Sequence, residues 1–383
     1  MRNAVWMTLI AAGLAFGGTV SSERVTLLRV PDGGIQPQVA VDARGVVHLL
    51  YFRGDAAGGD LYYVRSSDGA TFSRAIRVNS QRGSAVAIGN IRGGHLALGR
   101  NGRVHVAWNG SIAAEPRGPN RAPPMLYTLL DDRGDGFEAQ RNLVQSAYGL
   151  DGGGTVAADS VGNVYVFWHA PAPGTNGEAE RRVWVARSSN NGKTFERERT
   201  AFNEPTGACG CCGMAAFADS KGNLYALYRS AHEMVHRDIY LLFSRDHGVS
   251  FSGADVSPWN VGFCVMSLAA IAEGPKQVEA AWETERQVYF APIDPATGKS
   301  GTPVAAPGKA QDRRYPALAI NSRGETLLAW TEGMGWKKGG SVAWQVFDAN
   351  GRPEGERGEA PGVPVWSLVA AFARPDGRFA IMY

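Results

Sequence analysis

The chain has 383 residues, a formal net charge of +3 and 49 glycines, and aromatic residues make up 10% of it. This length supports a large hydrophobic core, while the near-neutral charge excludes the strongly basic surface typical of nucleic-acid binding. Abundant glycine and the lack of long helical periodicity predict an all-β chain with many turns.

The first residues are typical of a secretory signal peptide. Arg2 gives a positive start, the apolar run Ala4–Phe16 follows, and small residues continue to Ser22. The run is shorter than the roughly 20 residues of a membrane-spanning helix, although an uncleaved anchor is the alternative. We therefore expect residues 1–22 to be removed and the mature chain, 23–383, to be secreted or periplasmic without membrane association. Disulfides are stable in those compartments.

A turn recurs along the whole chain at intervals of roughly 50–60 residues, which is the size of a four-stranded propeller blade. In each copy a short apolar run precedes the turn and a second one follows it. The runs span about five to seven residues, which is typical of strands and too short for helices. The seven turns are Asp42–Gly45, Gly99–Gly102, Asp159–Gly162, Asp219–Gly222, Glu273–Lys276, Asn321–Gly324 and Arg374–Gly377.

An aromatic residue ends the second strand of every copy. These residues are Tyr51, Trp108, Trp168, Tyr228, Trp282, Trp330 and Tyr383. Their recurrence at one phase of the repeat predicts a structural role, in which large rings pack between neighbouring blades.

The number of blades follows from the two chain ends. The first six copies each supply four predicted strands, but the last copy, Ser367–Tyr383, supplies only two. The segment Arg24–Val30 has strand character and belongs to no copy. Pairing it with the final hairpin closes the ring and removes open sheet edges. We therefore predict an all-β propeller with seven blades, the last one composite; six blades is the alternative.

A third repeated feature is the turn between the third and fourth strands. Residues 188–195 and 244–251 have the pattern S-x-[DN]-x-G-x-x-F. The Asp or Asn bonds backbone amides of the turn, and we expect the Phe to fill the core of its blade. The pattern resembles the Asp-box, or bacterial neuraminidase repeat, of the sialidase superfamily, and the resemblance covers nearly the whole mature chain. It implies the propeller fold but no particular activity.

The same resemblance implies candidate catalytic residues. Sialidases bind the substrate carboxylate with three arginines, one of them in an R-I-P motif entering the first blade, and use a Tyr nucleophile assisted by Glu. Here the first-blade stretch, residues 35–37, has Gln36 in place of Arg, and residues 314–316 of the sixth copy match the motif better. The implied set is Tyr315 as nucleophile, Glu283 as base, and Arg229, Arg286 and Arg314 as the triad.

In a propeller, the loops that enter strand 1 and leave strand 2 lie on one face, around the central channel. A concave polar surface there is the default binding site. The candidate ligand-binding residues on these loops are His95, Asn109, Asp151, His169 and Trp366. We expect a glycan, a small molecule or a protein as the ligand.

All four cysteines lie on the entering loops. Cys209, Cys211 and Cys212 precede strand 1 of the fourth copy, and Cys264 precedes strand 1 of the fifth, so adjacent blades should bring the sulfurs together. One interpretation is two disulfides, with a vicinal Cys211–Cys212 bridge among the pairings. A second is a soft-metal site for copper(I) or zinc, to which Met266 adds a thioether. A reactive thiol pair is the third.

The stretch 232–236 has the pattern H-E-x-x-H. That pattern forms a zinc site when a helix carries it. Because it lies between two β runs here, it does not indicate a metalloprotease. Its histidines remain candidates for a further metal ligand.

Two functions of different classes fit these observations. One is a binding propeller, non-catalytic or metal-dependent, built around the cysteine cluster. The other is a glycoside hydrolase of the exo-α-sialidase type. Sulfurs within bonding range of one point favour the first, and an arginine cluster around one pocket favours the second.

Overall fold

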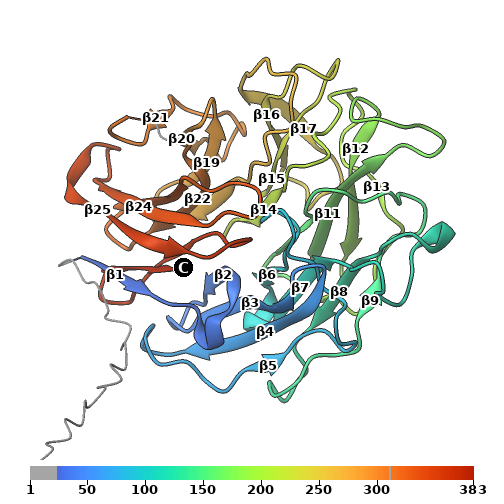
Figure 1. Ribbon diagram of the computed structural model, residues 1–383, viewed down its shortest axis with the longest axis horizontal. Helices are drawn as coiled ribbons and strands as arrows, with labels where there is room; N and C mark the ends of the chain where they lie inside the picture. The colour runs from blue at the N-terminus through green and yellow to red at the C-terminus, as the bar shows by residue number, and fades with distance from the viewer. Residues whose placement is uncertain (1–23, 310–311) are drawn as a thin grey trace, which may run out of the picture.

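The computed structural model describes residues 24–309 and 312–383, which form seven β-sheets arranged in a ring (Figure 1). The prediction of an all-β propeller with seven blades is confirmed. The predicted signal peptide, residues 1–22, lies outside the described residues. Within the described ranges, no helix has the length and apolar character needed to cross a membrane.

Six sheets each contain four antiparallel strands that follow one another along the chain. Blades one to three are β2 (Ile35–Val41), β3 (Val47–Asp55), β4 (Gly58–Ser66) and β5 (Ile76–Arg77); β6 (His95–Leu98), β7 (Val104–Asn109), β8 (Met125–Leu129) and β9 (Arg141–Asn142); and β10 (Thr155–Ala158), β11 (Val164–Pro171), β12 (Arg181–Ser188) and β13 (Arg199–Thr200). Blades four to six are β14 (Ala215–Ala218), β15 (Leu224–Arg229), β16 (Ile239–Ser244) and β17 (Ser252–Ser257); β18 (Ala270–Glu273), β19 (Val278–Thr284), β20 (Gln287–Ile293) and β21 (Val304–Ala305); and β22 (Arg314–Ile320), β23 (Thr326–Glu332), β24 (Gly340–Phe347) and β25 (Pro353–Val363). Short 3-10 turns are η1 (Pro31–Gly33), η2 (Arg100–Gly102) and η3 (Pro119–Arg121).

The seventh blade is built from both ends of the described chain, as predicted. β26 (Ala370–Ala373) and β27 (Phe379–Met382) form an antiparallel hairpin, and β1 (Val25–Leu28) pairs with β27 in parallel. Figure 1 shows β1, in blue, beside the red C-terminal strands. Among the described residues this sheet has three strands and not four. Leu27 is only 3% exposed, so the closure also buries apolar surface.

The aromatic residues that end the second strands pack between blades. Trp108, Trp168, Trp282 and Trp330 are at most 1% exposed. Trp108 of blade two shares a buried cluster with Leu50 of blade one. The predicted structural role is therefore confirmed.

Side chains hold the turns between the third and fourth strands, also as predicted. Asp246 Oδ1 accepts a hydrogen bond from the Ser250 amide at 2.9 Å, and the Ser244 hydroxyl accepts one from the Gly248 amide at 2.9 Å. Slight burial acts to raise the pKa of Asp246, but hydrogen bonds from Ser250 and Ser244 lower it to about 2. The turn geometry explains the repeated residues by local chemistry.

The phenylalanines of these turns are placed differently from the expectation. Phe195 of blade three lies 4.7 Å from the ring of Tyr127 in blade two, and Phe251 of blade four lies 5.9 Å from the ring of Phe167 in blade three. Each ring therefore contacts the preceding blade. The sequence period identified the position, but the direction of packing depends on the neighbouring sheet.

Candidate functional site

A recurring contact joins the end of strand 2 in one blade to the loop entering the next blade. Asn109, the last residue of β7, donates to the Gly152 carbonyl at 2.8 Å. His169 in β11 hydrogen-bonds to the Cys212 carbonyl at 3.0 Å. Both were candidate ligand-binding residues, and the structure places their polar atoms against the backbone of entering loops. They position the loops that carry the candidate site.

His169 is held in one tautomer. Arg181 Nε donates to His169 Nδ1 at 2.9 Å, so the proton lies on Nε2, which donates to the Cys212 carbonyl. Burial lowers the pKa of His169 to about 3, and the charge of Arg181 acts in the same direction. A neutral, buried imidazole therefore fixes the peptide of Cys212.

The four cysteines meet between blades four and five, as the sequence predicted. Cys211 and Cys264 form a disulfide, with Cα atoms 6.3 Å apart. Cys209 and Cys212 are buried free thiols. The expectation of two disulfides is therefore wrong, and the vicinal Cys211–Cys212 bridge is not formed. Because these residues come from two entering loops, their state depends on how the blades meet and not on sequence spacing.

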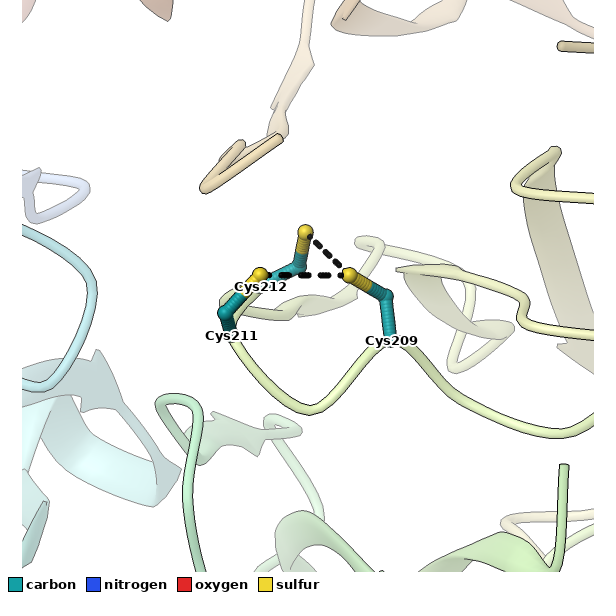
Figure 2. Close-up of side chains that lie close together, drawn as sticks. All are labelled: Cys209, Cys211 and Cys212. Carbon is teal, nitrogen blue, oxygen red and sulfur yellow. Dashed lines mark hydrogen bonds between the residues drawn. The ribbon is translucent and has the colours of Figure 1, made fainter. Parts of the chain in front are cut away.

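Cys209 is the middle sulfur of the cluster. Its Sγ lies 3.0 Å from Cys212 Sγ and 3.5 Å from Cys211 Sγ (Figure 2). The ligand atoms of all three residues lie within 4.8 Å of one another. The turn that brings them together is closed by the Cys212 amide, which donates to the Cys209 carbonyl at 3.2 Å.

Polar neighbours surround the Cys212 sulfur. The Ser267 amide and hydroxyl lie 3.4 and 3.5 Å from it. Burial acts to raise the pKa of Cys212, but the hydrogen bond from Cys209, the charge of Arg229 and the contacts of Ser267 lower it. The hydrogen bond to Cys212 and burial raise the pKa of Cys209. Cys209 and Cys212 therefore share one hydrogen bond between their sulfurs, and the charge of Arg229 favours the deprotonated form of Cys212.

An ion pair that sequence reasoning missed supports the cysteine loop. Glu178 accepts the Gly210 amide at 2.5 Å through one oxygen and pairs with Arg237 at 2.7 Å through the other. Arg237 is 4% exposed, and its charge acts on Cys209. Glu178 lies between β11 and β12, whereas Arg237 lies between β15 and β16, so no local pattern indicated the pairing.

A buried carboxyl group lies beside the cysteines. Glu283, in β19, is 1% exposed, and its Oε2 has no hydrogen-bond partner in the described structure. Burial raises the pKa of Glu283 to about 7, although the charges of Arg314 and Arg229 act to lower it. The charge of Cys212 also acts on this carboxyl group. The carboxyl group and the thiol cluster therefore form one electrostatic unit.

The other implied catalytic residues are arranged around Glu283. Each nitrogen of the Arg229 guanidinium donates one hydrogen bond: to the Ser267 hydroxyl at 2.8 Å, to the Arg237 carbonyl at 2.5 Å, and to the Glu283 carbonyl. Arg314 donates to the Val265 carbonyl at 3.0 Å. In contrast, the third implied arginine, Arg286, pairs with Asp312 in an exposed ion pair at 3.2 Å.

Tyr315 is the residue implied as nucleophile. It is 4% exposed, and burial raises its pKa. Its φ of 50° is unusual for a bulky residue, and such backbone geometry occurs preferentially at functional sites. The charges of Arg314 and Glu283 act on its hydroxyl. The structure thus brings together Glu283, Tyr315, Arg229 and Arg314, while their catalytic roles remain predictions.

Two further candidate ligand-binding residues lie on blades two and three. His95 begins β6, with its Nδ1 3.4 Å from the Thr155 hydroxyl, and burial lowers its pKa to about 4. Asp151 pairs with Arg92 at 2.5 Å and keeps 49% of its side chain exposed. Asp151 is therefore available to solvent, whereas His95 belongs to the contact between blades.

Trp366 and Met266 lie on entering loops and have positive φ angles of 62° and 51°. The Trp366 carbonyl accepts a hydrogen bond from Gln36 at 2.7 Å, and its ring packs against that of Trp336 at 4.7 Å. The methyl end of Met266 lies beside Gly89. These residues remain predicted ligands.

Ile91 packs across the loops that carry the site. It is 1% exposed and belongs to one cluster with Leu268 and Tyr315. Its carbonyl lies so close to Gly153 and Gly213 that a side chain at either position would collide with it or press against it. Loops entering blades three to six therefore meet around the Ile91 segment.

The H-E-x-x-H stretch lies on the loop between β15 and β16 and not on a helix. The ligand atoms of His232, Glu233 and His236 lie within 4.8 Å of one another. His236 Nδ1 is also 2.7 Å from the Asn260 amide oxygen. The expectation that this stretch is not helical is confirmed.

Together, the fold and the site define a seven-bladed β-propeller with a cysteine cluster between blades four and five. No protein-family model matches the sequence, and no curated protein matches it. Among solved structures, it is similar to an α-L-arabinanase of Penicillium chrysogenum complexed with arabinobiose, with 12% identity, coverage of 87% of this chain and 96% of that chain, and a TM-score of 0.51.

Two other solved structures match with lower TM-scores. A mutant NanB sialidase of Streptococcus pneumoniae has 11% identity, with 95% of this chain and 68% of that chain covered and a TM-score of 0.47. A fucose-specific lectin from Aleuria aurantia has 14% identity, with 87% and 95% covered and a TM-score of 0.48. At 12% identity the likeness to the arabinanase concerns the fold alone, because unrelated functions share propeller folds.

Proposed function

We propose that this chain is an exported binding propeller that holds a soft metal ion, copper(I) or zinc, at its cysteine cluster. The observation that carries the proposal is the spacing of Cys209, Cys211 and Cys212, whose ligand atoms lie within 4.8 Å of one another. Two sulfurs bound to one zinc at about 2.3 Å can lie no more than about 4.6 Å apart. The Cys209 sulfur already lies within that range of the other two, at 3.0 Å from Cys212 and 3.5 Å from Cys211.

The charges around the cluster support metal-binding thiolates. Arg229 acts on Cys212 and Arg237 acts on Cys209, and both arginines are nearly inaccessible to solvent. Cationic side chains in a poorly hydrated site lower the free energy of a thiolate. Sulfur-only ligation favours copper(I) and zinc over hard cations such as magnesium.

The disulfide sets the condition for binding. With Cys211 and Cys264 bridged, the cluster offers only the two thiols of Cys209 and Cys212. Reduction adds two sulfurs, one of them on the exposed Cys264 loop. Metal affinity should therefore rise when the bridge is reduced.

A competition titration tests this function. The reduced protein is titrated anaerobically with copper(I) against a coloured copper(I) chelator, and with zinc in a separate experiment. We expect about one equivalent per chain, and loss of that uptake in Cys209→Ser and in Cys212→Ser. His236→Ala is the control, since it removes a ligand from the other cluster of ligand-type side chains. Uptake that survives both cysteine substitutions, or no uptake by the wild-type chain, contradicts the proposal.

A sialidase-like glycoside hydrolase acting on glycans is the second candidate function. The observation that favours it is Glu283, a carboxyl group with a pKa of about 7 beside Tyr315. A group with such a pKa transfers protons efficiently near neutrality. The burial of both side chains argues against substrate access. We therefore expect little or no sialic acid release from α-linked substrates. Robust turnover that Glu283→Gln abolishes and Glu285→Gln preserves would establish this second function instead.

A further inference from the structure

We propose that the four cysteines form an intramolecular disulfide relay, which transfers the disulfide between the surface bridge Cys211–Cys264 and the buried pair Cys209–Cys212. This activity is thiol–disulfide exchange, and it requires no metal. It goes beyond the proposed function, because a chain that binds no metal could still carry it out.

The sulfurs are ordered from solvent to interior. Cys264 is exposed and Cys211 is partly buried, whereas Cys209 and Cys212 are at most 1% exposed. Cys209 contacts both neighbours in this order, at 3.5 Å from Cys211 and 3.0 Å from Cys212. Figure 2 shows these contacts meeting at the Cys209 sulfur. Exchange needs a thiolate in contact with one sulfur of a disulfide; Cys209 has the contact, and it reacts once it has lost its proton.

The first step forms a bond between Cys209 Sγ and Cys211 Sγ. The Cys211–Cys264 bond breaks, and its electron pair leaves on Cys264 Sγ. Cys209 loses one proton and Cys264 takes up one at the surface. The product has a Cys209–Cys211 bridge and a free, exposed Cys264 thiol.

The second step forms a bond between Cys212 Sγ and Cys209 Sγ. The Cys209–Cys211 bond breaks, its electron pair leaves on Cys211 Sγ, and one proton passes from Cys212 to Cys211. Overall, one disulfide and two thiols give one disulfide and two thiols. No outside oxidant or reductant is therefore needed.

The local chain supports both end states. Cys209 and Cys212 are three residues apart, which is the spacing of redox-active dithiols. Their turn is already closed by the backbone bond from the Cys212 amide to the Cys209 carbonyl, at 3.2 Å. On the other side, Gly262, Phe263 and Cys264 are exposed, so this segment can separate once its bridge opens.

The relay predicts that Cys264 becomes free without any reductant. The full-length mature protein is incubated natively with iodoacetamide and with chelators for copper and zinc, and is then quenched in acid for disulfide mapping. In the wild-type chain we expect alkylation of Cys264, accompanied by a Cys209–Cys211 or Cys209–Cys212 bridge. In Cys209→Ser we expect Cys264 alkylation to slow at least about tenfold, because no thiol remains in contact with Cys211.

Cys212→Ser provides an independent arm. Since only the second step needs Cys212, this variant should still release Cys264 and should stop at the Cys209–Cys211 bridge. Equal alkylation rates in wild type and Cys209→Ser overturn the relay. So does a wild-type chain that retains only Cys211–Cys264 throughout. If Cys209→Ser does not fold, mapping of the wild type decides the question alone. Metal uptake is measured separately, so failure of the relay and failure of metal binding are distinguishable.

Discussion

Replacing Glu283 by Gln should change how stability depends on pH. Burial raises the pKa of Glu283 from 4.5 to about 7. Between those values the folded chain retains a proton that the unfolded chain has released. The contribution of Glu283 to stability is therefore largest below pH 4.5 and falls as the pH rises to about 7. At about 1.4 kcal/mol per pH unit, and with the side chain fully buried, the loss is about 3 kcal/mol.

Glu283→Gln removes this ionisation while preserving the size of the side chain. The assay is urea unfolding of both chains at pH 4 and pH 8, and the quantity compared is the difference in unfolding free energy. We expect the variant to gain about 3 kcal/mol relative to wild type between the two pH values. Glu285→Gln is the control, since Glu285 is exposed on the same hairpin. A difference that stays constant with pH would refute the assignment of a protonated, buried carboxyl group.

Three further predictions concern the fold. Leu27→Ala in β1 should lower the free energy of unfolding, measured in urea, by about 2–5 kcal/mol, because Leu27 is 3% exposed. Thr26→Ala, at a half-buried position of the same strand, should lower it far less. Equal effects would mean that β1 does not close the ring. Asp246→Ala should cost about 1 kcal/mol for the lost turn bonds and leave metal uptake unchanged, and a loss of uptake by a folded variant would show that the turn serves the site. Burial lowers the pKa of His105 to about 3, so its neutral form contributes stability above about pH 6.5 that is lost as the pH falls toward 3. His105→Gln should therefore weaken the dependence of the thermal unfolding midpoint on acid pH. A variant with the same pH dependence as wild type would contradict the assignment of a buried, neutral His105.

The fold could be predicted because each of its signals is local and repeated. The turn Asp219–Gly222 and the aromatic Tyr228 recur at one period, so the other copies support the strand assignment wherever a single copy is ambiguous. The composite blade followed from counting the predicted strands, since the last copy had only two and Arg24–Val30 belonged to no copy. The parallel pairing of β1 with β27 could not be predicted, because either direction closes the ring.

The candidate site was predicted only in part. Chain position brought Cys264 close to the other cysteines, because adjacent blades present equivalent loops. Sequence spacing does not encode which sulfurs bond: Cys211 bonds to Cys264 of the other loop, whereas Cys209 and Cys212 stay thiols although their sulfurs are 3.0 Å apart. The Glu178–Arg237 ion pair joins residues 59 apart and produces no repeated pattern from which the sequence could have predicted it. The sequence showed that Asn109 and His169 occupy the same position, directly after Trp108 and Trp168, but not that they hydrogen-bond to the loop entering the next blade.

The most direct test of the metal site is X-ray absorption spectroscopy of the reduced protein loaded with one equivalent of zinc. Metal held by Cys209, Cys211 and Cys212 predicts a first shell dominated by sulfur at about 2.3 Å. A first shell of nitrogen and oxygen alone, at about 2.0–2.2 Å, would place the metal elsewhere and contradict the account.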